Sequence, residues 1–260
     1  MSGFVSAVRT LTVLPVFGKD AASMTRALPW FPVVGALLGG LMVGAGLLIQ
    51  LVFPGWHMLT TVLLLTVQTL FTGAIHLDGA ADAGDALFSL TSREKKLEIM
   101  KDSRLGTYGV LSLIFVIIVK VVLLYELVSS DHMVLLVIAI IISRTAQVEL
   151  TTTMHYARKD AGTAKSFVEG AGGLHRGIAW MVCLALLAVF GPLAIAAGAV
   201  ALPVIWGLRR VYNQRVGGVT GDLLGAASEL VEIAMLLWLC AWVYNGKWFE
   251  WPVAIYEVFV

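Results

Sequence analysis

The sequence predicts an all-α fold: a polytopic membrane helical bundle of about six to seven transmembrane helices, preceded by an amphipathic helix. Two observations of composition support this prediction. Hydrophobic residues make up 59% of the 260 positions and charged residues only 13%, whereas soluble domains carry about 25% charged residues. The mean hydropathy is +0.89. In addition, the apolar residues gather in runs of about 20, the length that crosses the hydrocarbon layer of a membrane.

The first 17 residues have the pattern of an amphipathic helix that lies in the membrane interface. Apolar residues recur at helical spacing from Phe4 to Leu11, and Pro15 ends the pattern. A signal peptide is the alternative, but Arg9 interrupts its apolar region and no small-residue cleavage site follows. We therefore expect this segment to stay with the protein as an interfacial helix.

Five apolar runs have the length of single membrane spans. The first two, 31–53 and 58–75, contain no charged residue and are separated by a turn at Pro54 and Gly55. The other three carry ionisable residues, which are costly in a membrane unless they are paired. These runs are 108–128 with Lys120 and Glu126, one from Met133 with Arg144 and Glu149, and one from Leu223 to Tyr244 with Glu229 and Glu232. For Arg144 and Glu149 we expect pairing with each other or with Glu229.

The stretch 178–208 is too long for one comfortable span and short for two, since 31 residues of helix extend about 46 Å. Gly191 and Pro192 interrupt it. Lys and Arg in short connections favour the cytoplasmic side, and two short spans place every positive connection on that side. The sequence thus favours seven spans, with the N-terminus inside and the C-terminus outside.

Composition also excludes several classes of protein. The net charge of +1 implies no broad basic surface, so no nucleic acid is expected as a partner. Cys183 and Cys240 lie in apolar runs without a metal-ligand spacing, which argues against disulfides and zinc. We expect one integral-membrane catalytic domain over residues 1–260, embedded in a lipid bilayer. The oligomeric state stays open, a homo-oligomer included.

An acidic segment continues directly from the second apolar run. Asp78, Asp82 and Asp85 stand at i, i+4 and i+7, which places them on one face of a helix. Like charges on one face repel, and a divalent cation with oxygen ligands, Mg²⁺ or Mn²⁺, would compensate them. The small residues of 79–84 leave room for a bulky ligand. His76 is either a ligand, a base or an ordinary interfacial histidine.

A second polar segment, 98–109, precedes the third span. Lys101 and Arg104 are donors suited to phosphate, and Asp102 follows Glu98 at i+4. Gly106 and Gly109 flank the expected start of a helix, where free backbone N–H groups favour an anion. A salt-bridged surface helix would explain the same residues.

A third polar segment combines three arginines with a glycine-rich turn. Its candidate substrate-binding residues are Arg215, Gly217, Gly218, Thr220 and Gly221, with Asp222 directly after them. Thr220 or Asp222 could cap the helix that follows, and the whole is a plausible phosphate cradle. A tight turn between spans is the simpler alternative. All three segments fall on the predicted cytoplasmic side, where they suggest phosphoryl transfer or diphosphate chemistry.

Together these segments resemble one family. The motifs are His-Leu-Asp-Gly-x-x-Asp-x-x-Asp at 76–85, Glu-Ile-Met-Lys-Asp-Ser-Arg-Leu-Gly-Thr-Tyr-Gly at 98–109, and Gly-Gly-x-Thr-Gly-Asp-x-Leu-Gly-Ala with Glu-Leu at 217–230. In this order and among apolar spans they resemble the bacterial cobalamin synthases, the adenosylcobinamide-GDP ribazoletransferases. The resemblance covers nearly the whole chain.

The resemblance implies an Mg²⁺-dependent enzyme of the bacterial inner membrane whose active site faces the cytoplasm. Such an enzyme joins adenosylcobinamide-GDP to α-ribazole or its 5′-phosphate and releases GMP. By the same resemblance, Mg²⁺ would be held by Asp78, Asp82, Asp85 and Asp222, while Lys101, Arg104 and Arg215 would balance phosphate charge. The base stays open among Asp85, Asp102 and His76. The loop 156–167 matches the family less well, because Thr163-Ala164 replaces a more glycine-rich pattern.

Two alternatives belong to other classes. A CDP-alcohol phosphotransferase also carries an acidic helix motif, but here Ala81 is followed by Asp82 instead of Arg, and the later spacing fails. A cation-coupled transporter predicts carboxylates near the bilayer midplane, whereas most acidic residues here lie at span ends. Only Lys120 is a mid-span charge that favours it.

Overall fold

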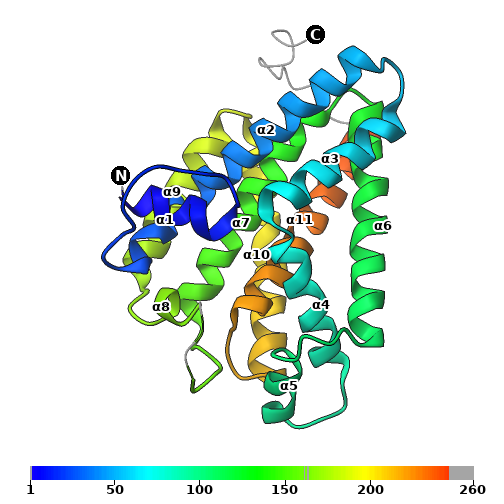
Figure 1. The fold of residues 1–260 in the computed structure, drawn as a ribbon. Coiled ribbons are helices and arrows are strands. Elements are labelled where there is room, and N and C mark those ends of the chain that lie inside the picture. The colour runs from blue at the N-terminus through cyan, green and yellow to red at the C-terminus, as the bar shows by residue number, and fades with distance from the viewer. Residues whose placement is uncertain (1, 161, 163, 246–260) are drawn as a thin grey trace.

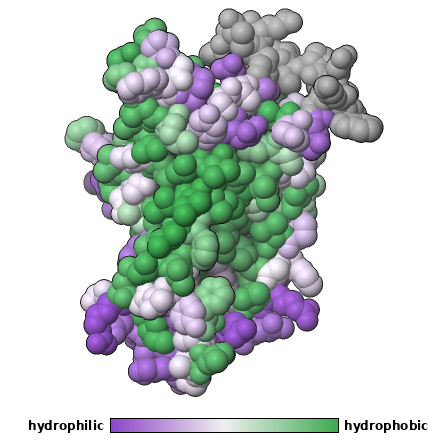
Figure 2. All heavy atoms as spheres, turned by 90° about the vertical axis from the view of Figure 1, so that its right-hand side faces the viewer, coloured by the Kyte–Doolittle hydropathy of each residue, from purple (hydrophilic) through white to green (hydrophobic). Residues whose placement is uncertain are grey.

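The computed structural model describes residues 2–160, 162 and 164–245, and that part of the chain forms a helical bundle (Figure 1). Figure 2 shows a broad apolar band between two polar ends. Among the described residues, five helices are long and apolar enough to cross a membrane: Met24–Val52, Thr107–Ser129, Met133–Thr153, Pro192–Arg215 and Gly221–Tyr244. The predicted all-α polytopic membrane bundle is confirmed, while residues 246–260, including the C-terminus, lie outside the described part.

The N-terminal helix packs on the protein itself. Helix α1 (Ser2–Leu11) lies against the 3₁₀ segment η1 (Met24–Trp30), which leads into α2 (Phe31–Val52). Val5, Ala7, Val8 and Leu11 of α1 are buried, and Phe4 packs against Trp30 of η1. A Cβ at Gly3 would collide with the backbone of η1, so the two segments touch closely. The amphipathic helix is present as predicted, but its apolar face covers protein.

The acidic segment does not continue the second span. Helix α3 (His57–Thr72) ends before α4 (Ile75–Phe88), and the two axes are bent by 89°. Gly73 and Ala74 both adopt positive φ at the bend, +60° and +58°. The left-handed conformation of two successive residues ends α3 and redirects the chain. This bend, which the hydropathy did not reveal, lays α4 against two other helices.

The long apolar stretch is divided where the sequence indicated. Helix α9 (Gly173–Ala188) is followed by α10 (Pro192–Arg215), and Gly191 at the break has φ +85°. Pro192 begins α10 at a position where its missing N–H costs nothing. With the five long helices, the bent pair α3–α4 gives up to six candidate spans among the described residues, which meets the lower of the two predicted counts; α9 is apolar but shorter than these spans, so a seventh span stays a prediction.

Helix α7 (Leu136–Thr153), entered through η2 (Met133–Leu135), is the most buried span, with α2 and α11 (Gly221–Tyr244) packed on it. At the periphery, α6 (Thr107–Ser129) exposes many apolar side chains, as a lipid-facing helix does. The short helices α5 (Arg93–Ile99) and α8 (Lys165–Val168) lie at the end of the bundle where α4 ends and α11 begins (Figure 1).

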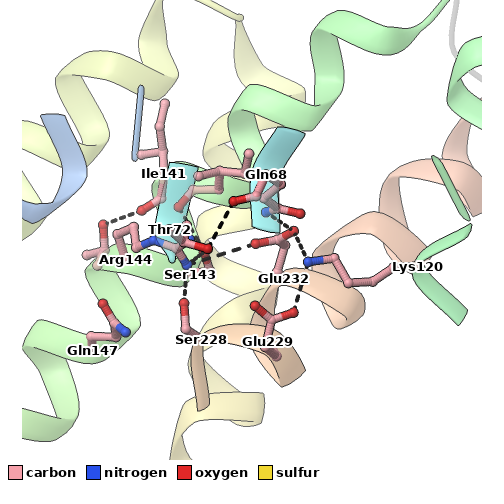
Figure 3. Close-up of polar contacts among 12 residues, drawn as sticks. Gln68, Thr72, Lys120, Ile141, Ser143, Arg144, Gln147, Ser228, Glu229 and Glu232 are labelled. Carbon is pink, nitrogen blue, oxygen red and sulfur yellow. Dashed lines mark hydrogen bonds and ion pairs between the residues drawn. The ribbon is translucent and has the colours of Figure 1, made fainter. Parts of the chain in front are cut away.

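A cluster of paired charges is buried between the spans (Figure 3). Lys120 donates to Glu229 and Glu232, both at 2.8 Å, and Arg144 lies 3.9 Å from Glu232. Gln68 also donates to Glu232, at 2.7 Å. We call these four charged residues the buried ion cluster. Its two cations and two carboxylates cancel, which makes burial of all four tolerable.

The pairing predicted for Arg144 was therefore wrong with respect to Glu149. That carboxylate accepts a hydrogen bond from the Trp180 indole at 2.8 Å and lies 3.7 Å from Arg176 on α9. Glu149 is near the end of α7, within reach of the polar start of α9. Arg144 lies deeper, where Glu232 is its carboxylate partner.

Candidate active site

The acidic face of α4 lies beside the first turn of α11. A Cβ added to Gly79 would lie 2.6 Å from the backbone oxygen of Asp222, and one added to Gly225 would lie 3.2 Å from that of Ile75. The two helices thus cross with their backbones in contact. The small residues of 79–84 are buried in helix packing, which corrects the expectation that they leave space for a ligand. Gly79 lets Asp222 of α11 approach α4, while Gly84 faces Ser112 of α6.

Negative charge accumulates at this crossing. The charges of Asp78, Asp222 and Asp85 all act on the Asp82 carboxylate, and Arg158 is the cation that acts on it. Among the described residues, Asp78 and Asp82 receive no hydrogen bond and form no ion pair. Carboxylates without a protein partner, grouped in this way, suit a cation bound from solution.

Asp85 has a structural partner. Its two oxygens accept hydrogen bonds from the backbone N–H groups of Gly106, at 2.7 Å, and Gly109, at 2.8 Å. These are free donors at the start of α6, where the helix dipole favours an anion. The sequence correctly indicated an anion at these glycines, but the anion here is Asp85 of the same chain. We therefore place Asp85 as the cap of α6.

Replacement of Asp85 by Ala is expected to destabilise the protein by about 1–2 kcal/mol, because the first turn of α6 loses its acceptor. Asp85→Asn keeps one acceptor oxygen and should lose less. Thermal unfolding in detergent measures the stability, and hydrogen exchange at residues 106–110 reports on the helix start. Unchanged exchange in Asp85→Ala would contradict the capping role.

The glycine-rich turn is tied to the loop after α7. Val219 donates to the His155 oxygen and accepts from the Ala157 N–H, both at 2.9 Å. This short pairing carries Arg158 onto Asp222, where the two side chains meet at 2.7 Å. In the sequence Arg158 is one of several positive residues of the 156–167 loop, with nothing that marks it out. Its pairing with Asp222 depends on two segments 64 positions apart.

The predicted phosphate-binding cations are paired with carboxylates at the surface. Lys101 contacts Asp160, and Arg104 donates to Asp102 at 2.6 Å. The hydrogen bonds from Arg104 lower the pKa of Asp102 to about 2. Asp102 therefore stays ionised near neutral pH and is a weak proton acceptor, since an effective base titrates near the working pH.

The third segment contributes its expected helix cap. Thr220 accepts the Leu223 N–H at 3.3 Å and begins α11. Gly217 has φ +74°, and its oxygen accepts from Arg93 at 3.1 Å. Arg215 is exposed at the end of α10. Burial of Lys96 lowers the pKa of that lysine, and the charge of Arg215 lowers it further. Gly218 and Gly221 are part of the same turn, so the candidate residues of this segment are brought together.

Lys96 was not anticipated from the sequence. Its ammonium is buried and donates to the backbone oxygens of Ala86, at 3.0 Å, and Ser89. Free carbonyls end every helix, and a cation there satisfies them and the helix dipole. Lys96 thus fixes α5 to the end of α4. Lys96 stands beside three other charged residues in 93–96, so the sequence alone does not indicate this role.

His76 lies away from the carboxylates. It is buried, with 3% of its surface exposed, and lines a cavity together with residues of α1, α7 and α8. Among the described residues no three His, Cys, Asp or Glu side chains are grouped closely enough to hold a metal by themselves. Asp78 and Asp222 are near enough for their charges to act on Asp82, whereas Asp85 is hydrogen-bonded to the start of α6 and His76 lines the cavity.

Comparison with known proteins gives a consistent result. Residues 3–240 match the family described as cobalamin-5-phosphate synthase. The chain belongs to this family. A Chlorobium phaeobacteroides protein named adenosylcobinamide-GDP ribazoletransferase is 41% identical, over 92% of this chain and 96% of its own. Proteins of the same name from Chlorobaculum tepidum and Klebsiella pneumoniae are 40% and 36% identical, over 95% and 91% of this chain and 98% of each relative. No solved structure matches.

As a cobalamin-5-phosphate synthase family member, the protein is a transferase of cobalamin biosynthesis with several apolar membrane helices. The expected enzyme class is confirmed, and neither a CDP-alcohol phosphotransferase nor a transporter is favoured. The buried Lys120, which had supported a transporter, is neutralised by Glu229 and Glu232.

Proposed function

We propose that this protein joins adenosylcobinamide-GDP to α-ribazole or its 5′-phosphate, with release of GMP, at the acidic crossing of α4 and α11. The family and the names of the relatives support this reaction. The structural observation that carries the proposal is the pair Asp78 and Asp82, two carboxylates with no partner in the described part of the chain, beside the Asp222–Arg158 pair. A diphosphate substrate needs such a combination of metal ligands and a cation.

Mg²⁺ is the metal that fits this donor set. Asp78, Asp82 and Asp222 offer oxygen atoms only, which Mg²⁺ prefers, and they leave positions for water and phosphate oxygens. When bound there, Mg²⁺ neutralises the charge of the diphosphate. Arg158, Lys101 and Arg104 lie at the same end of the bundle, each paired with a carboxylate in this structure.

The reaction is a displacement at phosphorus. The ribose 3′-hydroxyl oxygen of α-ribazole forms a bond to the cobinamide-side phosphorus, the bond from that phosphorus to the bridging oxygen breaks, and GMP leaves with that oxygen. The hydroxyl proton passes to a base. Asp102 is too acidic to take this proton, and both oxygens of Asp85 accept hydrogen bonds from the start of α6. Asp78 and Asp82 are already assigned to Mg²⁺ and His76 is buried on the wall of a cavity, so none of these residues is assigned here as the base.

The orientation in the membrane follows from charge. The connections 89–106 and 154–172 are rich in Lys and Arg, and Arg209, Arg210 and Arg215 lie in the last turns of α10, at the end that holds the acidic crossing. The positive-inside rule places this end in the cytoplasm. We therefore propose a protein of the bacterial inner membrane whose site opens to the compartment that contains nucleotides.

Purified protein in lipid nanodiscs tests the reaction. With both substrates and Mg²⁺, we expect GMP and the cobalamin product to appear in equal amounts, and EDTA to stop both. Chromatography of the corrinoid and nucleotide pools measures them. GMP release without α-ribazole would indicate a hydrolase instead, and folded protein that forms no product would contradict the proposal.

A further inference from the structure

A second candidate binding feature lies beside the acidic crossing. A cavity of about 520 Å³, open on one side, is lined by α1, η1, the starts of α2, α4 and α11, the end of α7, and α8. Its walls are mostly apolar and include Leu28, Phe31 and Phe167, the two phenylalanine rings being 6.1 Å apart. Small-molecule sites have this character: about 300–1,000 Å³, apolar walls and few polar groups.

Two polar side chains on the cavity wall each have one atom without a hydrogen-bond partner among the described residues. His76 and Gln147 are 3% and 4% exposed, and neither His76 Nδ1 nor Gln147 Oε1 has a hydrogen-bond partner among the described residues. The other end of the Gln147 amide is held by the Leu224 oxygen at 3.3 Å, which orients the side chain. Buried polar atoms normally find partners in a folded protein, so these two residues of the cavity wall are the candidates for polar contacts with a ligand.

The cavity is adjacent in the chain to the residues that would carry the reaction. His76 precedes Asp78 by two residues, and Gly221, also on the cavity wall, directly precedes Asp222. Because α4 and α11 cross with their backbones in contact near Gly79 and Gly225, the cavity and the acidic face are formed by the same two helix starts.

We propose that this cavity binds the benzimidazole base of α-ribazole, an inference that rests on the proposed function. The base is flat, uncharged and largely apolar, which suits walls with phenylalanine rings. Its free ring nitrogen is an acceptor for His76 Nδ1–H, and a ribose hydroxyl is a donor for Gln147 Oε1. The charged GDP end does not suit apolar walls, and a corrin ring is too large for the volume. The ribose then extends toward Asp222.

The variants His76→Phe and Gln147→Leu remove one polar atom each while keeping the bulk of the side chain. In both we expect the KM for α-ribazole, at saturating adenosylcobinamide-GDP, to rise about tenfold, the cost of one lost hydrogen bond to a buried partner. The KM for adenosylcobinamide-GDP should change less than about twofold. Equilibrium dialysis with α-ribazole alone should show the same loss of affinity.

His175→Phe and Gln50→Leu are matched controls, because both residues lie outside the cavity wall. Bare 5,6-dimethylbenzimidazole should compete with α-ribazole, and ribose 5-phosphate should not. An unchanged KM and Kd for α-ribazole in both cavity variants would overturn the inference, as would a rise confined to the corrinoid KM. Absence of turnover in the wild type would refute the proposed function, while dialysis still tests the cavity.

Discussion

Replacement of Asp82 by Asn is expected to lower turnover by more than about a hundredfold and, at the same time, to raise the melting temperature of the metal-free protein. Loss of groups that only support metal ligands already costs about 10–100-fold, so loss of a ligand should cost more. The charges of Asp78, Asp85 and Asp222 act on Asp82, and removal of its charge relieves this repulsion. GMP release and thermal unfolding in EDTA measure the two effects.

The same variant should lose its response to Mg²⁺. Metal that binds the folded state stabilises it, by about 2.7 kcal/mol at a hundredfold excess over Kd, and we expect this stabilisation in the wild type and little of it in Asp82→Asn. Asp131→Asn is the matched control: Asp131 is exposed in the connection between α6 and η2 and has φ +62°, which Asn tolerates. Equal Mg²⁺ stabilisation of Asp82→Asn and wild type would remove Asp82 from the metal site.

Replacement of Lys120 by Met is expected to destabilise the protein by about 3–5 kcal/mol, because Glu229 and Glu232 would remain buried beside an incomplete set of cations. The side chains of these three residues are at most 4% exposed. Thermal or SDS unfolding in detergent measures the loss. The double variant Lys120→Met/Glu229→Gln leaves one cation and one carboxylate, and should recover part of it.

A surface pair gives the matched control. Lys95 and Glu98 are also 2.8 Å apart, but their side chains are 59% and 66% exposed. Lys95→Met should therefore cost less than about 1 kcal/mol. If Lys95→Met and Lys120→Met destabilise the protein equally, the buried ion cluster does not hold the spans together.

The helices themselves were predictable because they depend on local properties of the chain. A run of about 20 apolar residues must form a helix in a membrane, since no water satisfies its backbone there. The break at Gly191 and Pro192, the cap at Thr220 and the helical acidic face of 78–85 likewise follow from residues within a few positions of each other. The family could also be predicted from the sequence, because its motifs are short and occur in a fixed order along the chain.

The partners of the polar residues were decided by tertiary structure. Lys120 and Glu229 are 109 positions apart, Arg158 and Asp222 are 64 apart, and nothing in either local sequence selects the other. The bend at 73–74 directs Asp85 to the start of α6, away from the role in metal binding that its spacing suggested. Hydropathy determines which segments become helices, but the packing of those helices determines which charges meet, because pairing requires contact and contact depends on how distant helices cross.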